Sequence, residues 1–301
     1  AFGLAESLAV LVAARFVQGL GGAASWTGAL GWLVAAGPPE RRGELIGTAF
    51  GAAVAGSLLG PVLGAIADGT TPELAFGAVA ALAVGLTAAT LATPKPVTAA
   101  GASGGFRLAL RQRPVLAGMA MIVLVGLFFG VLEVLVPLRL DELGGGTVLI
   151  AGTFLAGAGL QALASPVAGR HVDRRGPLPI VRAALLAAVA LALVVPALGA
   201  VAPLVVLAVA AGPLVGMLWV PGMTALSDGA DTVGLDQAFA FALVNLTWAG
   251  AQTAGAGGGG ALADSAGDWA SYGAVAALMA LALAVTLRAR GEPEPARTAS
   301  T

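Results

Sequence analysis

Two ionisable residues lie inside long apolar stretches of the sequence, where a charged group is costly and usually serves a function. Arg15 lies several residues into the stretch 7–36, so we expect it to face the protein interior; the alternative is that it snorkels to a polar boundary. Glu133, in FFGVLEVLVPLRL, is the only acid well inside any apolar stretch. Glu133 could exchange a proton or balance the charge of a cationic substrate, or it could pair with Arg139.

Polar side chains of one later stretch share a helix face. Asn245 and Gln252 are seven residues apart, and Trp248 lies between them on nearly the same side. These amides could bind a substrate in a cavity, although hydrogen bonding between helices is the commoner role of a buried amide in a membrane. The weaker candidates for the cavity wall are Gln161, Trp219 and Trp26.

The sequence lacks the residues of several other chemistries. It contains no cysteine and a single histidine, His171, so it cannot supply the three or four ligands of a typical zinc site. It also lacks the glycine-rich phosphate loop of ATP-driven pumps. No stretch combines a nucleophile with a base. We therefore expect a protein that is not an enzyme and needs no cofactor or metal.

The composition places these residues in a membrane. Of the 301 residues, 58% are hydrophobic and only 10% are charged, whereas about a quarter of a soluble domain is charged. The net charge is -1, which provides no basic surplus for binding nucleic acid. The composition therefore predicts an all-α protein that crosses the lipid bilayer several times.

Apolar stretches long enough to span a bilayer as helices recur along the chain. We count nine, at 7–36, 44–67, 73–93, 114–138, 147–168, 178–199, 201–226, 234–262 and 267–288. Alternate loops are basic, so the positive-inside rule places the carboxyl end in the cytoplasm. One loop on that side, 227–234, carries Asp228 and Asp231 and no basic residue.

The stretch 47–68, GTAFGAAVAGSLLGPVLGAIAD, has glycines mostly three to five residues apart, as close helix packing requires. Its spacing resembles the antiporter motif G-x8-G-x3-GP-x2-GG in the fifth helix of the major facilitator superfamily. The matching residues are Gly47, Gly56, Gly60, Pro61 and Gly64, and Ala65 replaces the final glycine. In that family the motif is associated with proton-coupled drug exporters, and it is thought to pack the fifth helix against the other half of the protein.

Two further stretches resemble signatures of the same family. ARFVQGLGGAA, residues 14–24, is similar to the fourth-helix signature R-x2-Q-G-x-G, with matches at Arg15, Gln18, Gly19 and Gly21. GRHVDRRGPLP, residues 169–179, is similar to the loop signature G-x3-D-R-x-G-R/K, with matches at Gly169, Asp173, Arg174 and Gly176. The resemblance implies that Arg15 takes part in proton coupling and that the loop residues form a charge network locking one transport state. The simpler interpretation of Asp173 is that it caps a helix in a basic loop. We place Gln18 among the cavity candidates.

The resemblance implies a major facilitator-type helical bundle that lacks its first two to three helices. Residues 1–93 would be the remnant of the amino-terminal half, 94–113 a cytoplasmic linker, 114–288 a six-helix carboxyl-terminal half and 289–301 a cytoplasmic tail. We expect a monomer of the cell membrane that exports small, partly apolar compounds in exchange for protons by alternating access. The alternatives are a metabolite uptake porter or uniporter, and an inactive transporter fragment.

Overall fold

The computed structural model of this chain describes residues 7–60, 63, 66, 69–93 and 106–288. Helices dominate this part of the chain, which contains no strand. In order, the elements are α1 (Leu8–Ala36), the 3-10 helix η2 (Pro39–Arg41), α2 (Arg42–Ser57), α4 (Pro72–Ala92), α5 (Phe106–Ala109), α6 (Arg113–Glu142), α7 (Thr147–Arg175), α8 (Leu178–Val194), the 3-10 helix η3 (Val195–Ala197), α9 (Val201–Gly216), α10 (Trp219–Thr232), α11 (Gln237–Ala266) and α12 (Asp268–Arg288). The predicted all-α fold is confirmed.

Seven helical segments of the described residues are long and apolar enough to cross a membrane, against nine expected stretches. The described part of α2 is short, at 16 residues, and the glycines and amides of α11 make that helix less apolar than the seven. The stretch 201–226 forms two helices, α9 and α10, that together make one span. The break precedes Pro221, which has no N–H to donate to the carbonyl of Met217.

Helix ends coincide with residues suited to capping. The side chain of Ser7 accepts a hydrogen bond from the backbone N–H of Val10 at the start of α1. Thr71 does the same for Leu74 at the start of α4, where Pro72 occupies the first helical position. Gly176 ends α7 with a φ of 76°, a backbone conformation that favours glycine.

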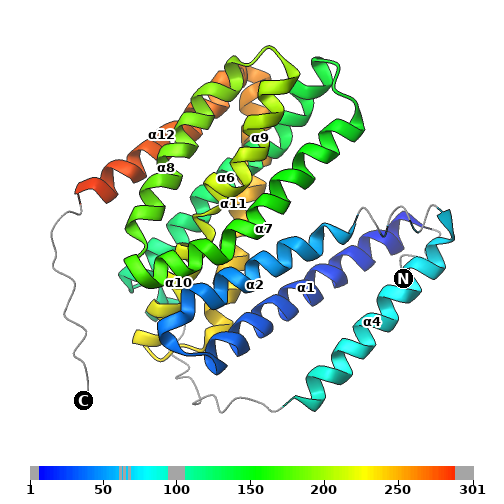
Figure 1. The fold of residues 1–301 in the computed structure, drawn as a ribbon, viewed down its shortest axis with the longest axis vertical. Helices are drawn as coiled ribbons and strands as arrows, with labels where there is room; N and C mark the ends of the chain where they lie inside the picture. The colour runs from blue at the N-terminus through cyan, green and yellow to red at the C-terminus, as the bar shows by residue number, and fades with distance from the viewer. Residues whose placement is uncertain (1–6, 61–62, 64–65, 67–68, 94–105, 289–301) are drawn as a thin grey trace.

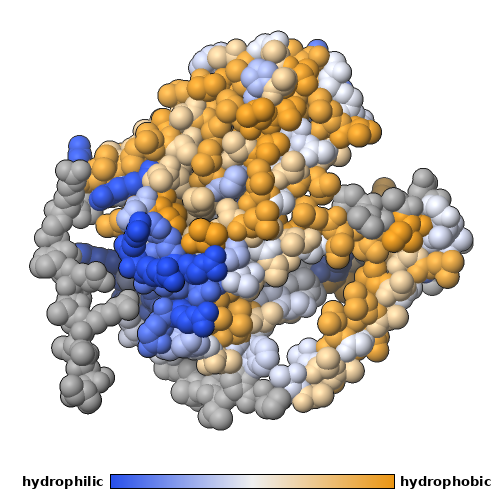
Figure 2. Space-filling model, in the orientation of Figure 1, coloured by the Kyte–Doolittle hydropathy of each residue, from blue (hydrophilic) through white to orange (hydrophobic). Residues whose placement is uncertain are grey.

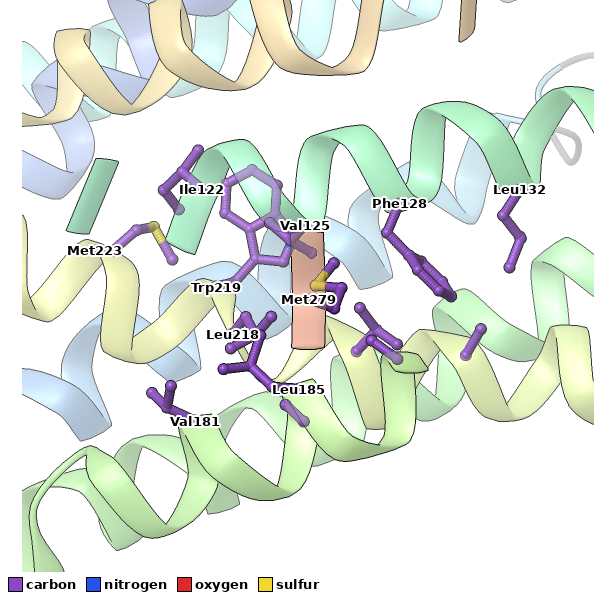
Figure 3. Packing of buried hydrophobic residues seen from close by; sticks show 14 of the residues in the cluster. Ile122, Val125, Phe128, Leu132, Val181, Leu185, Leu218, Trp219, Met223 and Met279 are labelled. Atoms are coloured by element: carbon purple, nitrogen blue, oxygen red, sulfur yellow. The ribbon is translucent and has the colours of Figure 1, made fainter. Parts of the chain in front are cut away.

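The largest buried cluster draws its side chains mainly from α6, α8, α9, α10, α11 and α12, with a few from α1 and α2. Figure 3 shows part of it, with labelled side chains at Ile122, Val125, Phe128, Leu132, Val181, Leu185, Leu218, Trp219, Met223 and Met279. Lipid tails are as apolar as these side chains, so in a bilayer this cluster is stabilised by close packing more than by removal from water.

The helices form one bundle with a looser flank. Figure 1 shows α6 to α12 together and α1, α2 and α4 to one side, with α2 close to α7 where α2 begins and the two helices diverging beyond. Of the residues of α4, only Ala75 is buried. In Figure 2, hydrophilic residues gather over the end where α2, α7 and α10 meet, and apolar residues cover most of the other described surface in view. An apolar flank of this kind is suited to contact with lipid.

Candidate functional site

A cavity of about 600 Å³ lies between the helices of residues 1–93 and those of residues 114–288. It is lined from α1, α2, α6, α7, α9, α10 and α11. Six of the seven residues expected in a substrate cavity line it, Trp26 among them, as does Glu133. The other five are Gln161, Trp219, Asn245, Trp248 and Gln252. None of the described lining residues is Lys, Arg or His.

Four aromatic side chains form a continuous row along this cavity, which we call the aromatic row: Trp26, Phe50, Trp219 and Trp248. The ring centroids of Trp219 and Trp248 are 4.5 Å apart, those of Phe50 and Trp219 are 5.0 Å apart, and those of Trp26 and Phe50 are 6.2 Å apart. These separations suit offset or edge-on packing of rings. The row therefore joins α1 and α2 to α10 and α11.

Glu133 is held by a residue of the facing helix. Gln252 of α11 donates a hydrogen bond from Nε2 to Oε2 of Glu133, at 2.8 Å. The predicted alternative partner, Arg139, is paired with Glu142 at 2.9 Å instead. Within the described residues, Oε1 of Glu133 has no hydrogen-bond partner, so this carboxylate oxygen is available to a bound group.

Glycines of α6 allow this contact. A Cβ placed on Gly130 would lie 2.5 Å from the carbonyl oxygen of Gln252, far inside van der Waals contact. A Cβ on Gly126 would lie 3.3 Å from the ring of Trp248. Since small residues let helix backbones approach closely, α11 can bring both Gln252 and Trp248 against α6.

Two further amides lie in the cavity wall. Nδ2 of Asn245 is buried and has no hydrogen-bond partner among the described residues. Gln161 is 9% exposed and packs on α9, where a Cβ on Gly216 would lie 2.5 Å from Nε2 of Gln161. A buried amide without a partner is costly, so Asn245 is suited to a hydrogen bond with a ligand or water.

An ionic contact, which we call the Arg42 clasp, joins α2 to α10. The guanidinium of Arg42 lies 2.7 Å from Oδ1 of Asp228 and also pairs with Asp231. Gln237 of α11 donates to Asp231 at 2.5 Å. Arg42 is 9% exposed, whereas the side chains of Asp228 and Asp231 are 57% and 47% exposed, so solvent partly screens the ion pairs. Asp228 and Asp231, which the sequence placed in a loop without a basic residue, thus lie in the last turns of α10 beside Arg42, the first residue of α2.

Asp173 connects α7 to the same end of α2. Its two carboxylate oxygens accept hydrogen bonds from the backbone N–H groups of Gly43 and Glu44, each at 2.8 Å. A carboxylate at a helix N-terminus satisfies unpaired donors and opposes the helix dipole. A Cβ on Gly169 would overlap the carbonyl of Gly43, which explains the small residue there. Of the other two residues of this signature, Arg174 is exposed and Gly176 ends the helix.

The glycines of α2 and of the motif divide into two groups. A Cβ on Gly47 would overlap the carbonyl of Ser165, and one on Gly51 would lie 2.5 Å from the carbonyl oxygen of Ala162, both in α7. Gly56 and Gly60 have no neighbouring atoms of this kind within 4 Å. Pro61 and Gly64 lie outside the described residues. Close packing on α7 therefore involves the first half of the motif and Gly51, which the motif does not include.

Arg15 and Gln18 lie away from the cavity. Arg15 donates a hydrogen bond to Gln18 at 3.0 Å, and both residues are exposed in the described part of the chain. The expectation that Arg15 faces the bundle interior is therefore not met there. Because these residues are one turn apart on α1, they form a local pair on one face of that helix.

The sequence-based reasoning missed two residues of this region. Phe50 was not singled out, although it lies three residues after the motif glycine Gly47 on α2. Arg42 was counted only as a basic loop residue, although the unbalanced acids at 227–234 indicated that a cation was needed nearby.

Comparison with known proteins agrees with this architecture. The family model described as Major Facilitator Superfamily matches residues 1–235. No curated protein matches the chain in sequence. Among solved structures, that of the human organic anion transporter MFSD10 (TETRAN) is similar in fold, with a TM-score of 0.72 and 20% sequence identity over 94% of this chain and 72% of that one. Members of the matched family are transporters, not enzymes. With a family match over more than half of its length, and with a helical membrane fold, this chain belongs to the Major Facilitator Superfamily.

Proposed function

We propose that this chain is a proton-coupled secondary transporter that exports small, partly apolar compounds across the cell membrane by alternating access. The observation that carries the proposal is the single carboxylate of the cavity, Glu133, held by Gln252 beside the aromatic row. A carboxylate in such a position can bind either a proton or a substrate, which couples the two.

The two ends of the cavity region differ, and this supports an alternating-access mechanism. At the end where α2 begins, the Arg42 clasp and the Asp173 cap join α2 to α10 and α7. Gly56, near the end of α2, and Gly60, just beyond it, have no close neighbours, and α2 diverges from α7. We propose that the joined end, with its basic loops, faces the cytoplasm and that the cavity is open to the outside.

The arrangement of the chain follows from this proposal. Residues 1–93 and 114–288 would provide the two walls that rock about the cavity, and the linker 94–113 and the carboxyl end would be cytoplasmic. Residues Gly47, Gly56, Gly60, Pro61 and Gly64 would form the bending seam of an exporter. Arg15 would assist proton transfer, and the protein would act as a monomer.

The test is transport by the full chain in proteoliposomes with a pH-sensitive dye inside. We expect apolar fluorescent compounds to move against a proton flow, and we expect Glu133→Gln to abolish this coupling while expression stays normal. Glu142→Gln, which removes a paired carboxylate near the end of α6, is the matched control and should transport normally.

Three results would overturn the proposal. Transport that is unaffected when a protonophore collapses the gradient would indicate a uniporter. Movement of compound in the same direction as the protons would indicate an uptake porter. No proton-dependent movement of any compound would indicate an inactive chain. Organic anions belong in the compound panel, because human MFSD10 is an organic anion transporter.

A further inference from the structure

We propose that the cavity selects organic cations over organic anions of the same size and shape. This inference rests on the proposed function of the cavity as the substrate site. It follows from the balance of charge in the cavity wall, from the aromatic row and from the way in which Glu133 is held.

The described cavity wall carries a negative charge without a basic residue to balance it. Glu133 is its only acid, and none of the described lining residues is Lys, Arg or His. The nearest basic residue in sequence, Arg139, is engaged by Glu142 at 2.9 Å. An unbalanced carboxylate attracts a cation and repels an anion, and the interaction strengthens as the ligand displaces water from the cavity wall.

The aromatic row adds a second preference of the same sign. The face of an indole ring is electronegative, and it attracts a cation placed within about 6 Å of the ring centroid. Trp219 and Trp248 both line the cavity, and their centroids are 4.5 Å apart. A flat or branched organic cation could therefore contact both rings, and its apolar parts would replace water against Phe50.

The carboxylate and the rings are placed to act on one ligand. Gln252, which donates to Glu133, lies four residues from Trp248 and therefore on the same face of α11. The hydrogen bond fixes Oε2 of Glu133 and leaves Oε1 without a partner among the described residues. A ligand that contacts Trp248 with its apolar part can therefore present its charge to Oε1.

The test compares two ligands of matched shape and opposite charge, naphthyltrimethylammonium and naphthalenesulfonate. Binding to the purified full chain is measured by titration calorimetry in detergent, with empty micelles as the blank. We expect the cation to bind at least tenfold more tightly. Glu133→Gln keeps the shape of the side chain and can still accept from Gln252, and it should bring the two affinities close together.

Two variants separate the contributions of charge and ring. Trp248→Leu should weaken binding of the cation more than binding of the anion. Glu142→Gln should leave the cation preference unchanged, since that carboxylate is paired and lies outside the cavity. Equal binding of the two ligands, tighter binding of the sulfonate, or a preference that survives Glu133→Gln would each overturn the inference.

The outcome is independent of proton coupling, because the calorimetry uses no gradient. Cation-selective binding without proton-driven movement would leave the inference standing and remove the exporter proposal. Proton-driven export of organic anions would remove the inference and leave the exporter proposal standing.

Discussion

The guanidinium of Arg42, at the start of α2, lies 2.7 Å from a carboxylate oxygen of Asp228, near the end of α10. These residues are 186 positions apart in the chain, and each belongs to a helix that also lines the cavity, through Phe50 and Trp219. Separation of α2 from α10 must break this ion pair, so the pair opposes opening of the protein at this end.

Neutralising Arg42 should therefore open that end more often. The chain has no cysteine, so a single Cys at Ala225, a partly buried neighbour of Arg42 on α10, can report access. We expect Arg42→Gln to raise the maleimide labelling rate at Ala225→Cys several-fold. The control is Arg41→Gln, because Arg41 is exposed and pairs only with Glu44 in its own segment. Equal labelling rates in both variants would show that the clasp does not hold this end closed.

Loss of the Asp173 cap should slow turnover more than it weakens substrate binding. Asp173→Asn removes the charge at the start of α2 and leaves one side-chain acceptor for two N–H groups. Such a cap contributes about 0.5–2 kcal/mol. We expect a lower transport rate with a KM within about twofold of the wild-type value. Asp236→Ala removes the side-chain cap of α11 and should lower thermal stability alone. An unchanged transport rate in Asp173→Asn would contradict the expectation that the Asp173 charge network locks one transport state.

The glycines of the antiporter motif should differ in their tolerance of alanine. A methyl group at Gly47 overlaps the carbonyl of Ser165, and overpacking of this kind costs about 1–3 kcal/mol. We expect Gly47→Ala to lower the thermal unfolding temperature, whereas Gly56→Ala and Gly60→Ala, which meet open space, should leave it unchanged or raise it slightly. Equal destabilisation by all three would indicate that the whole motif packs.

Gly130→Ala should disturb the site without touching its polar residues. The new Cβ would lie 2.5 Å from the carbonyl oxygen of Gln252, so α11 must move away from α6 and the Glu133–Gln252 bond must lengthen. We expect weaker binding of naphthyltrimethylammonium at unchanged expression. Gly250→Ala on α11, which has no neighbour within 4 Å, is the control. Unchanged cation binding in Gly130→Ala would mean that the hydrogen bond does not position Glu133.

Much of the fold could be predicted because bilayer thickness imposes one length scale on every span. The apolar interior of the bilayer also makes Asn245, Gln252 and Glu133 conspicuous in the sequence, since polar groups within apolar helices have few favourable positions. The partner of Glu133 could not be predicted, because the distance from α6 to α11 depends on how closely glycines let the two helices approach. That Gln252, not Arg139, approaches Glu133 is a property of the packed bundle.

Other features of the site have no local signature. Phe50 is one of 10 phenylalanines in an apolar sequence, and only its position opposite Trp219 distinguishes it. Arg42 has the same residue type and neighbourhood as Arg41, yet one is buried in a clasp and the other is exposed. The break between α9 and α10 could have been predicted from Pro221, since the missing N–H is visible in the sequence.

Phe50 and Arg42 lie on one helix, so α2 rigidly connects the aromatic row to the Arg42 clasp. The two residues are eight positions apart, or about 12 Å along a rigid helix. On the facing helix, Trp219 and Asp228 are nine positions apart and meet the same two partners. The ring contact and the ion pair therefore join the same two helices, so a ligand that separated the rings would load the ion pair directly, without a relay of intervening side chains.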